Sequence, residues 1–127
     1  MTIQNHKQKL GKTGEDFGVA FLQRKGHVII ARNWRGKYGE LDIVSMDGAT
    51  LVFTEVKTRR GQKFGTPQSA VTPLKQKHLC LAALEYITAN GYSDYNARFD
   101  VLALMQTTEG FKPEWLENAF EFMLDET

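Results

Sequence analysis

The order of apolar and polar positions predicts a helix near the start of the chain. Within residues 11–25, positions three or four apart share one face, as one side of an α-helix requires. These positions are Phe17, Ala20, Phe21 and Arg24. Thr13 is a candidate N-cap and Gly26 a candidate stop, so we expect the helix to lie between them. Residues 1–10 are a candidate flexible N-terminus.

Several later stretches have the composition of β-strands. Residues 27–35 (HVIIARNWR) and 40–46 (ELDIVSM) are separated by the turn-prone sequence GKYG. Residues 49–57 (ATLVFTEVK) and 97–106 (ARFDVLALMQ) predict two more strands. Residues 114–122 (EWLENAFEF) fit either a last strand or a short helix.

A second helix is predicted after Thr72-Pro73, since threonine is a favoured N-cap and proline is favoured at the first helical position. The segment LKQKHLCLAALEYITAN then runs to Gly91, a natural C-terminal cap. The order α-β-β-β-α-β, with a further β if the last element is a strand, predicts an α/β domain with a mixed central sheet flanked by helices. At 127 residues the chain fits a single domain, residues 1–127, with one core.

The pair Asp47-Gly48 is a strong signal for a hairpin between residues 40–46 and 49–57. If these two residues form the loop, Met46 pairs with Ala49. One face of the hairpin then carries Glu40, Asp42, Val44, Leu51, Phe53, Glu55 and Lys57. The other carries Leu41, Ile43, Ser45, Thr50, Val52, Thr54 and Val56. Both faces are apolar near the turn, so we expect the hairpin to be covered on both sides.

Carboxylates gather at the end of this hairpin that lies away from the turn. In the expected register Glu40 falls directly opposite Glu55 and Asp42 lies diagonal to it, about 5 to 8 Å away. Like charges so placed are destabilising, and a hard cation such as Mg²⁺ with oxygen ligands would compensate. Lys57 lies about 6.5 Å beyond Glu55 on the same face, and its flexible stem can return the ammonium to the pocket. A structural salt bridge between Lys57 and one carboxylate stays open as the alternative.

The carboxylates and the lysine match a known motif. Asp42, twelve intervening residues and then EVK at 55–57 resemble the PD-(D/E)xK motif of restriction-endonuclease-like nucleases, with Leu41 where the motif has proline. Three stretches, GEDFGVAFLQRKGHVIIARNWRGKYGELDIV, FTEVKTRRGQKFGTPQSAV and KQKHLCLAALEYI, together resemble the YraN-type family of small bacterial proteins, related to archaeal Holliday-junction resolvases. The likeness covers about residues 11–105 and implies a restriction-endonuclease-like fold.

The resemblance implies a catalytic set. Asp42 and Glu55 would bind Mg²⁺ or Mn²⁺, and Lys57 would position the attacking water or stabilise the charged phosphate. Glu15 matches an extra acidic residue of the resolvase-like branch and would complete the metal site, although an acid near a helix N-terminus is also favoured by the helix dipole. The implied reaction is phosphodiester hydrolysis that leaves a 5′ phosphate, with either one metal or two.

Other residues are expected around this set. Glu40 belongs to the pocket without an assigned role. Gln76 matches a helical glutamine of some relatives, but Cys80 replaces the aromatic residue that accompanies it there, and we expect Cys80 to fill the core. Asp100 is expected to pair with Arg98 or another strand neighbour, and a place in the surroundings of the site stays open as the alternative.

The charge of the chain is divided between its two parts. Residues 1–77 hold 14 Lys and Arg against 6 Asp and Glu, whereas residues 78–127 hold 2 against 9. A basic part of this kind favours a polyanion as partner, because binding releases condensed counterions. A solvated basic face is the alternative. The candidate nucleic-acid-binding residues are Arg32, Arg35, Lys37, Arg59, Arg60, Lys63, Lys75 and Lys77.

Taken together, the sequence predicts an endonuclease that cuts branched or single-stranded DNA in repair or recombination. The alternative is a nucleic-acid-binding accessory protein with the nuclease fold but little catalysis, and a third reading is an interaction module. A homodimer is left open. No apolar run reaches the roughly 20 residues that span a bilayer, and the polar start lacks the apolar stretch of a signal peptide, so a cytoplasmic location without membrane contact is expected.

Overall fold

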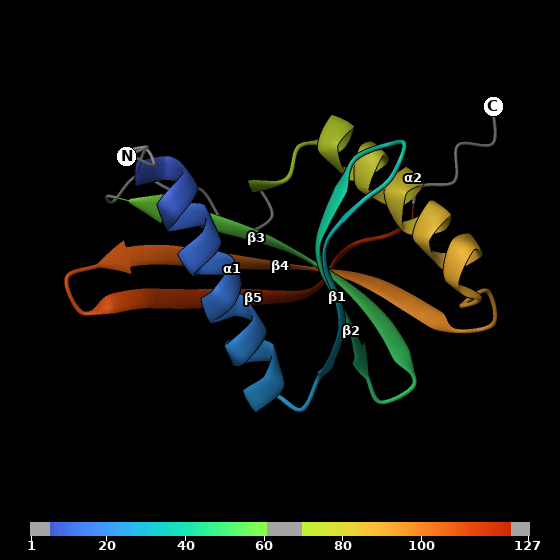
Figure 1. The fold of residues 1–127 in the computed structure, drawn as a ribbon, viewed down its shortest axis with the longest axis horizontal. Coiled ribbons are helices and arrows are strands. Elements are labelled where there is room, and N and C mark those ends of the chain that lie inside the picture. The colour runs from blue at the N-terminus through green and yellow to red at the C-terminus, as the bar shows by residue number, and fades with distance from the viewer. Residues whose placement is uncertain (1–5, 61–69, 123–127) are drawn as a thin grey trace, which may run out of the picture.

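The residues that the structure describes form a five-stranded sheet and two helices (Figure 1). The computed structural model describes residues 6–60 and 70–122, and their side chains from Thr13 onward. In chain order the elements are α1 (His6–Arg24), β1 (Val28–Arg35), β2 (Glu40–Asp47), β3 (Thr50–Arg60), α2 (Pro73–Asn90), β4 (Asn96–Thr107) and β5 (Gly110–Phe120). The predicted order is confirmed, and the last element is a strand.

The sheet is mixed. Its strands lie in the order β1-β2-β3-β4-β5, and every neighbouring pair is antiparallel except β3 and β4, which are parallel. A parallel pair needs a long connection, and α2 lies within it. The two helices cover opposite faces of the sheet: Ile43 and Val56 lie against α1 at Gly18, while Phe53 contacts Tyr86 of α2. The expected α/β class, and a hairpin covered on both sides, are therefore confirmed.

The β2–β3 hairpin forms, but its loop is one residue later than predicted. Asp47 pairs with Thr50, so Gly48 and Ala49 are the loop. Gly48 has φ +60°, and a glycine with positive φ at the first loop position is typical of a type II′ turn. Asp47 stays in the strand, where its carboxylate accepts a hydrogen bond from Arg98 at 3.0 Å.

The later loop changes the register without exchanging the faces. Val44 pairs with Phe53 and Ile43 with Thr54, so the next position along β2, Asp42, stands across from Glu55. The prediction that Glu40 lies opposite Glu55 is wrong. A shift of one residue in the loop moves the pairing by two positions, and a strand alternates with a period of two, so the expected faces survive near the turn.

Leu41 is the exception to the predicted faces. It belongs to the core under α2, although it was expected on the other face together with Ile43. Leu41 pairs with Trp34, whose ring contacts Tyr86 of α2 at a centroid distance of 5.3 Å. Asn33, the residue before Trp34 in β1, has φ +49°, a left-handed conformation that interrupts the alternation of side chains along that strand.

Helix α1 begins earlier than the sequence predicts. It starts at His6, so Thr13 lies inside it and is not its N-cap, and residues 6–10 are part of the helix. Gly14 does not interrupt the helix, because it allows a close approach to the sheet: a Cβ there would clash with Thr58 Cγ2. This contact sets the position of the neighbouring Glu15.

Helix α2 begins and ends where the sequence predicts. Thr72 is its N-cap and accepts a hydrogen bond from the backbone N–H of Lys75 at 3.2 Å, and Gly91 is its C-cap. Cys80 is buried in the core, as expected. Among the described residues, neither helix has the length and apolar character that crossing a membrane requires.

Candidate metal centre

The candidate site lies where β2 and β3 separate. Their paired stretch ends at Ile43 and Thr54, and the side chains of Asp42 and Glu55 follow at the fork. Asp42 Oδ2 accepts a hydrogen bond from the backbone N–H of Val56 at 2.9 Å. This side chain therefore links β2 to β3 just beyond the last backbone pair of the two strands. Glu55 is only 5% exposed, and its carboxyl group shares a hydrogen bond with that of Asp42.

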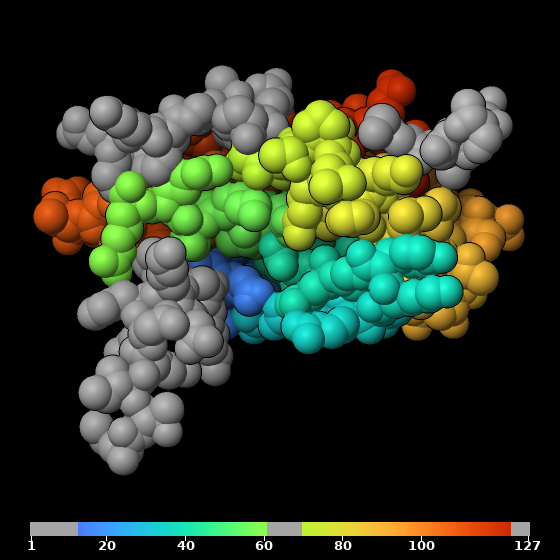
Figure 2. Space-filling model, turned by 90° about the horizontal axis from the view of Figure 1, so that it is seen from above, coloured from blue at the N-terminus to red at the C-terminus, as the bar shows by residue number. Residues whose placement is uncertain are grey.

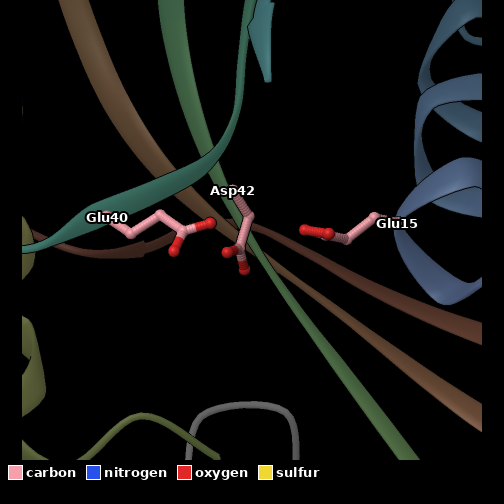
Figure 3. Close-up of side chains that lie close together, drawn as sticks. All are labelled: Glu15, Glu40 and Asp42. Atoms are coloured by element: carbon pink, nitrogen blue, oxygen red, sulfur yellow. The ribbon is translucent and has the colours of Figure 1, made fainter. Parts of the chain in front are cut away.

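Three carboxyl groups meet at this fork. Figure 3 shows Glu15 reaching from α1 toward Glu40 and Asp42 of β2. One oxygen from each lies within 4.8 Å of the others, and all three residues are half-buried. Figure 2 shows α1 (blue) beside β3 (green), so the helix that carries Glu15 lies next to the hairpin. Glu40, which the sequence places in the pocket without a role, is one of the three.

These carboxyl groups raise one another's pKa. Burial first, and then the hydrogen bond and charge of Glu55, raise the pKa of Asp42 to about 9. Burial, followed by the charge of Glu40, also raises the pKa of Glu15. Loss of water and a neighbouring negative charge both disfavour the ionised form. At neutral pH the fork therefore retains a proton that a bound cation would displace.

Glu55 is bound differently from the other three acids. Its Oε2 lies 3.5 Å from Lys75 Nζ and 3.9 Å from Lys57 Nζ. The ion pair of Lys57 with one carboxylate, expected as an alternative, is therefore present, and α2 contributes a second ammonium group. Glu55 is not among the described residues that converge within 4.8 Å, so Asp42 links the three-carboxylate cluster to the lysine-bound Glu55.

Asn33 is a site residue that the sequence reasoning missed. It stands across from Asp42 in the β1–β2 register, and its amide faces two acids of the cluster. With its nitrogen turned toward them, it donates hydrogen bonds to Glu15 Oε2 at 3.1 Å and to Glu40 Oε1 at 2.9 Å. A polar residue that tolerates left-handed φ, placed between two strand residues, is the signal that could have identified it.

Two of the predicted basic residues lie next to the cluster and pair with acids. Arg32 binds Asp16 of α1 at 2.6 Å, and Arg35 binds Glu40 at 3.0 Å. These guanidinium groups offset the negative charge around the site. The ammonium group of Lys37 instead lies over the Tyr38 ring, 5.7 Å from its centroid.

Other predicted basic residues lie further along the chain. Arg60, at the end of β3, and Lys77, on α2, are exposed, whereas Arg59 is half-buried. Lys63 lies outside the described residues.

Gln76 and Asp100 have hydrogen-bond partners outside the three-carboxylate cluster. The Gln76 side chain donates to the Val71 carbonyl at 3.1 Å, next to the start of α2. Asp100 accepts hydrogen bonds from Arg98 at 3.0 and 3.2 Å, as expected, and from Trp115 Nε1 at 3.1 Å. Asp100 therefore belongs to a structural ion-pair network.

The donor set of the cluster fits a hard divalent cation. Glu15, Glu40 and Asp42 offer carboxylate oxygens, the ligands that Mg²⁺ and Mn²⁺ prefer, with waters or phosphate oxygens completing the coordination. Histidine and cysteine, the usual zinc ligands, are not members of the group. Glu55 would join the set only by giving up contacts with Lys57 or Lys75.

The fold and the site define an α/β protein with a five-stranded mixed sheet and a carboxylate cluster where a helix meets a hairpin. Within this class the chain belongs to the family described as Uncharacterised protein family UPF0102, whose model matches residues 14–104.

Several members of this family are close relatives. A UPF0102 protein of Geobacter sulfurreducens is 49% identical over 118 residues, which cover 92% of each chain. One from Syntrophus aciditrophicus is 43% identical over 113 residues, 89% of each chain. One from Rhodococcus opacus is 46% identical over 100 residues, which cover 79% of this chain and 85% of that protein.

Proposed function

We propose that this protein is a Mg²⁺- or Mn²⁺-dependent endonuclease that hydrolyses phosphodiester bonds in branched or single-stranded DNA during repair or recombination. One observation carries the proposal: Glu15, Glu40 and Asp42 converge beside Glu55, and Lys57 reaches the same place. A protein that only binds DNA has no need for such a convergence of acids. The resemblance to PD-(D/E)xK nucleases supplies the reaction class and the restriction-endonuclease-like fold.

Each residue of the site has a part in this proposal. Glu15, Glu40 and Asp42 would hold the cation, which when bound acts as a Lewis acid and makes water a better nucleophile. Lys57 holds a fixed positive charge where negative charge builds on the phosphate, a contribution often worth several kcal/mol. Glu55 keeps the Lys57 ammonium in place, because it contacts the ammonium from a buried position.

The second candidate is an accessory protein that binds DNA and does not cut it. One observation favours it: Glu55 is already neutralised by Lys57 and Lys75, so part of the acidic set is satisfied without a cation. In that case the basic residues around the fork would bind phosphates. Arg32 and Arg35 would have to exchange Asp16 and Glu40 for phosphate.

The decisive experiment incubates the full chain with labelled duplex, single-stranded and four-way-junction DNA, in Mg²⁺, in Mn²⁺ or in EDTA. We expect cutting of the branched or single-stranded substrates with a divalent cation and none in EDTA. Glu55→Gln and Lys57→Ala should abolish it. Glu114→Gln and Lys112→Ala change exposed residues of β5 and should cut like the wild type.

The other outcomes separate the candidates. Binding without cutting under every condition would support the accessory protein and exclude the nuclease. Absence of binding to all three DNAs at moderate salt would exclude both and leave a module that binds a protein partner. Cutting that persists at the wild-type rate in both Glu55→Gln and Lys57→Ala would exclude these two residues from the reaction and contradict the proposed site.

A further inference from the structure

Asn33 has an unusual backbone conformation for a strand residue. Its φ is +49°, and it lies in β1 directly across from Asp42. Left-handed φ is unfavourable for residues with a side chain, and it persists where the surroundings fix it, often at functional sites. Here it separates two neighbours, because Arg32 reaches Asp16 of α1 while Trp34 packs on Tyr86 of α2. The strand thus turns the Asn33 side chain toward the cluster.

The Asn33 amide touches acids from two elements. The atom that faces the cluster lies 3.1 Å from Glu15 Oε2 and 2.9 Å from Glu40 Oε1. Carboxylates only accept hydrogen bonds, so in the cation-free protein this atom is the amide nitrogen, which donates to both. The contact lowers the pKa of Glu15, against the raising effects of burial and of Glu40. Asn33 therefore joins α1 to β2 across the cluster that Figure 3 shows.

An amide can also offer an oxygen in the same place. A half-turn about the last side-chain bond exchanges nitrogen and oxygen with little change in shape. We propose that Asn33 is a ligand of the cation held by Glu15, Glu40 and Asp42, and that its amide turns from donating nitrogen to coordinating oxygen when the cation binds. This inference rests on the cation site of the proposed function.

The separations at the cluster suit this role. Oxygen ligands of a cation at 2.0 to 2.1 Å in octahedral geometry lie roughly 3 Å from one another. The Asn33 atom lies 3.1 Å from Glu15 Oε2 and 2.9 Å from Glu40 Oε1, and it approaches Glu15 Oε1 more closely, at 2.5 Å. Replacing the N–H donor with an oxygen at these distances is unfavourable unless a cation lies between the oxygens, so the amide orientation depends on the cation.

The choice of asparagine also has a physical reason. A neutral ligand adds an oxygen without adding to the repulsion among three carboxylates. Asparagine tolerates left-handed φ better than most residues. Glycine would keep the backbone but remove the ligand, and aspartate would keep an oxygen but lose the donating nitrogen. These two substitutions separate the possible roles.

The test titrates Mn²⁺ and Mg²⁺ into the cation-free full chain by calorimetry. Asn33→Gly should weaken the affinity about tenfold, at the lower end of the range for residues that support a metal site. Asn33→Asp should bind at least as tightly as the wild type, because an oxygen remains and a charge is added. Asn118→Gly is the matched control, since Asn118 also has positive φ, +53°, but lies in β5 away from the cluster. It should bind like the wild type.

Three outcomes would overturn the inference, and they differ in what else they overturn. Wild-type affinity in Asn33→Gly excludes a ligand role and leaves the proposed cation site intact. Weakened affinity in both Asn33→Gly and Asn33→Asp shows that the amide acts only as a hydrogen-bond donor. No binding of either cation to the wild type removes the cation site of the proposed function, and the inference with it. Circular dichroism of each variant checks that the fold is kept.

Discussion

The carboxyl groups of Asp42 and Glu55 share a hydrogen bond at the fork between β2 and β3. A hydrogen bond between two carboxyl groups needs a proton, and burial first, followed by this hydrogen bond and the charge of Glu55, raises the pKa of Asp42 to about 9. The unfolded chain holds no such proton at pH 7, because a free aspartate has a pKa of about 3.9. Folding therefore takes up a proton here, and stability from this group falls as the pH rises from about 4 toward 9.

Asp42→Asn should stabilise the cation-free protein at pH 8. Asparagine needs no proton uptake, and its amide can still accept from the Val56 N–H and donate to Glu55. We expect a gain of about 1 kcal/mol or more, which corresponds to a rise in Tm of roughly 3 to 5 °C. The gain should shrink toward pH 4, where aspartate is protonated in the folded state and about half protonated in the unfolded one. Thermal unfolding at pH 4, 6 and 8 measures it.

The same variant should lose stabilisation by cations. Added Mg²⁺ or Mn²⁺ should raise the Tm of the wild type but leave that of Asp42→Asn unchanged, since binding to the folded state alone raises stability. Asp94→Asn, in the exposed loop after α2, is the control and should behave like the wild type in both tests. A variant less stable than the wild type at pH 8 would contradict the shared proton.

Gly14→Ala should destabilise the fold and weaken cation binding. The added methyl group clashes with Thr58 Cγ2, and overpacking of this kind costs about 1 to 3 kcal/mol, more than the roughly 1 kcal/mol that alanine adds to a helix. Because α1 would move away from the sheet, Glu15 would withdraw from the cluster. Urea unfolding and cation titration measure the two effects.

A second substitution tests the cause. Thr58→Ser deletes the methyl group that Gly14 contacts, so the double variant should recover most of the stability lost in Gly14→Ala. Thr58→Ser alone should change little. A double variant as unstable as the single one would show that the glycine serves another purpose.

Lys57 and Lys75 should contribute differently to DNA cutting, although both contact Glu55. Lys57→Ala should reduce cleavage at least a hundredfold, as expected when a fixed charge beside a reacting group is lost. Lys75→Ala should mainly weaken DNA binding. The slope of log affinity against log salt concentration should become shallower by roughly 0.9, the value for one lost phosphate contact on duplex DNA. Binding measured in Ca²⁺ at several salt concentrations gives this slope.

Lys112→Ala, on the far edge strand, should leave both the rate and the slope unchanged. Equal losses of cutting in Lys57→Ala and Lys75→Ala, with unchanged DNA affinity in both, would mean that the two lysines act as a unit through Glu55.

His27 should make the fold acid-sensitive. It is 4% exposed, its Nδ1 lies 2.9 Å from Ser45 Oγ, and burial lowers its pKa. The folded state therefore resists protonation that the unfolded chain accepts, so stability should fall as the pH drops below about 6.5. His27→Gln should reduce this loss between pH 7.5 and 5.5 in urea unfolding. His78→Gln, on the exposed face of α2, should not.

Much of the β2–β3 hairpin was predictable, because its turn region and the faces of its strands depend on residues close together in the sequence. The alternation of residues 40–57 fixed which side chains share a face near the turn, and the Asp47-Gly48 pair marked the turn region. The loop position was not predictable from that pair alone. Asp47 stays in the strand, where it binds Arg98, and Arg98 is distant in sequence.

The convergence of the carboxylates depends on contacts between distant segments. The sequence shows Glu15 as an acid in a helix, but its place beside Glu40 follows from the close contact of Gly14 with the sheet. The second ammonium group on Glu55 depends on where α2 docks. The left-handed φ of Asn33 and the place of Leu41 in the core under α2 do not follow from a pattern of period two either.

The parallel junction between β3 and β4 joins residues 46 positions apart, from Thr50 with Asn96 to Arg60 with Gln106. Closing so long a loop is slow compared with forming a hairpin, and synthesis proceeds from the N-terminus. All four acids of the fork precede β4 in the chain. A nascent polypeptide on the ribosome therefore holds all four acids before β4 has been made, so the β2–β3 hairpin can form ahead of the parallel pairing.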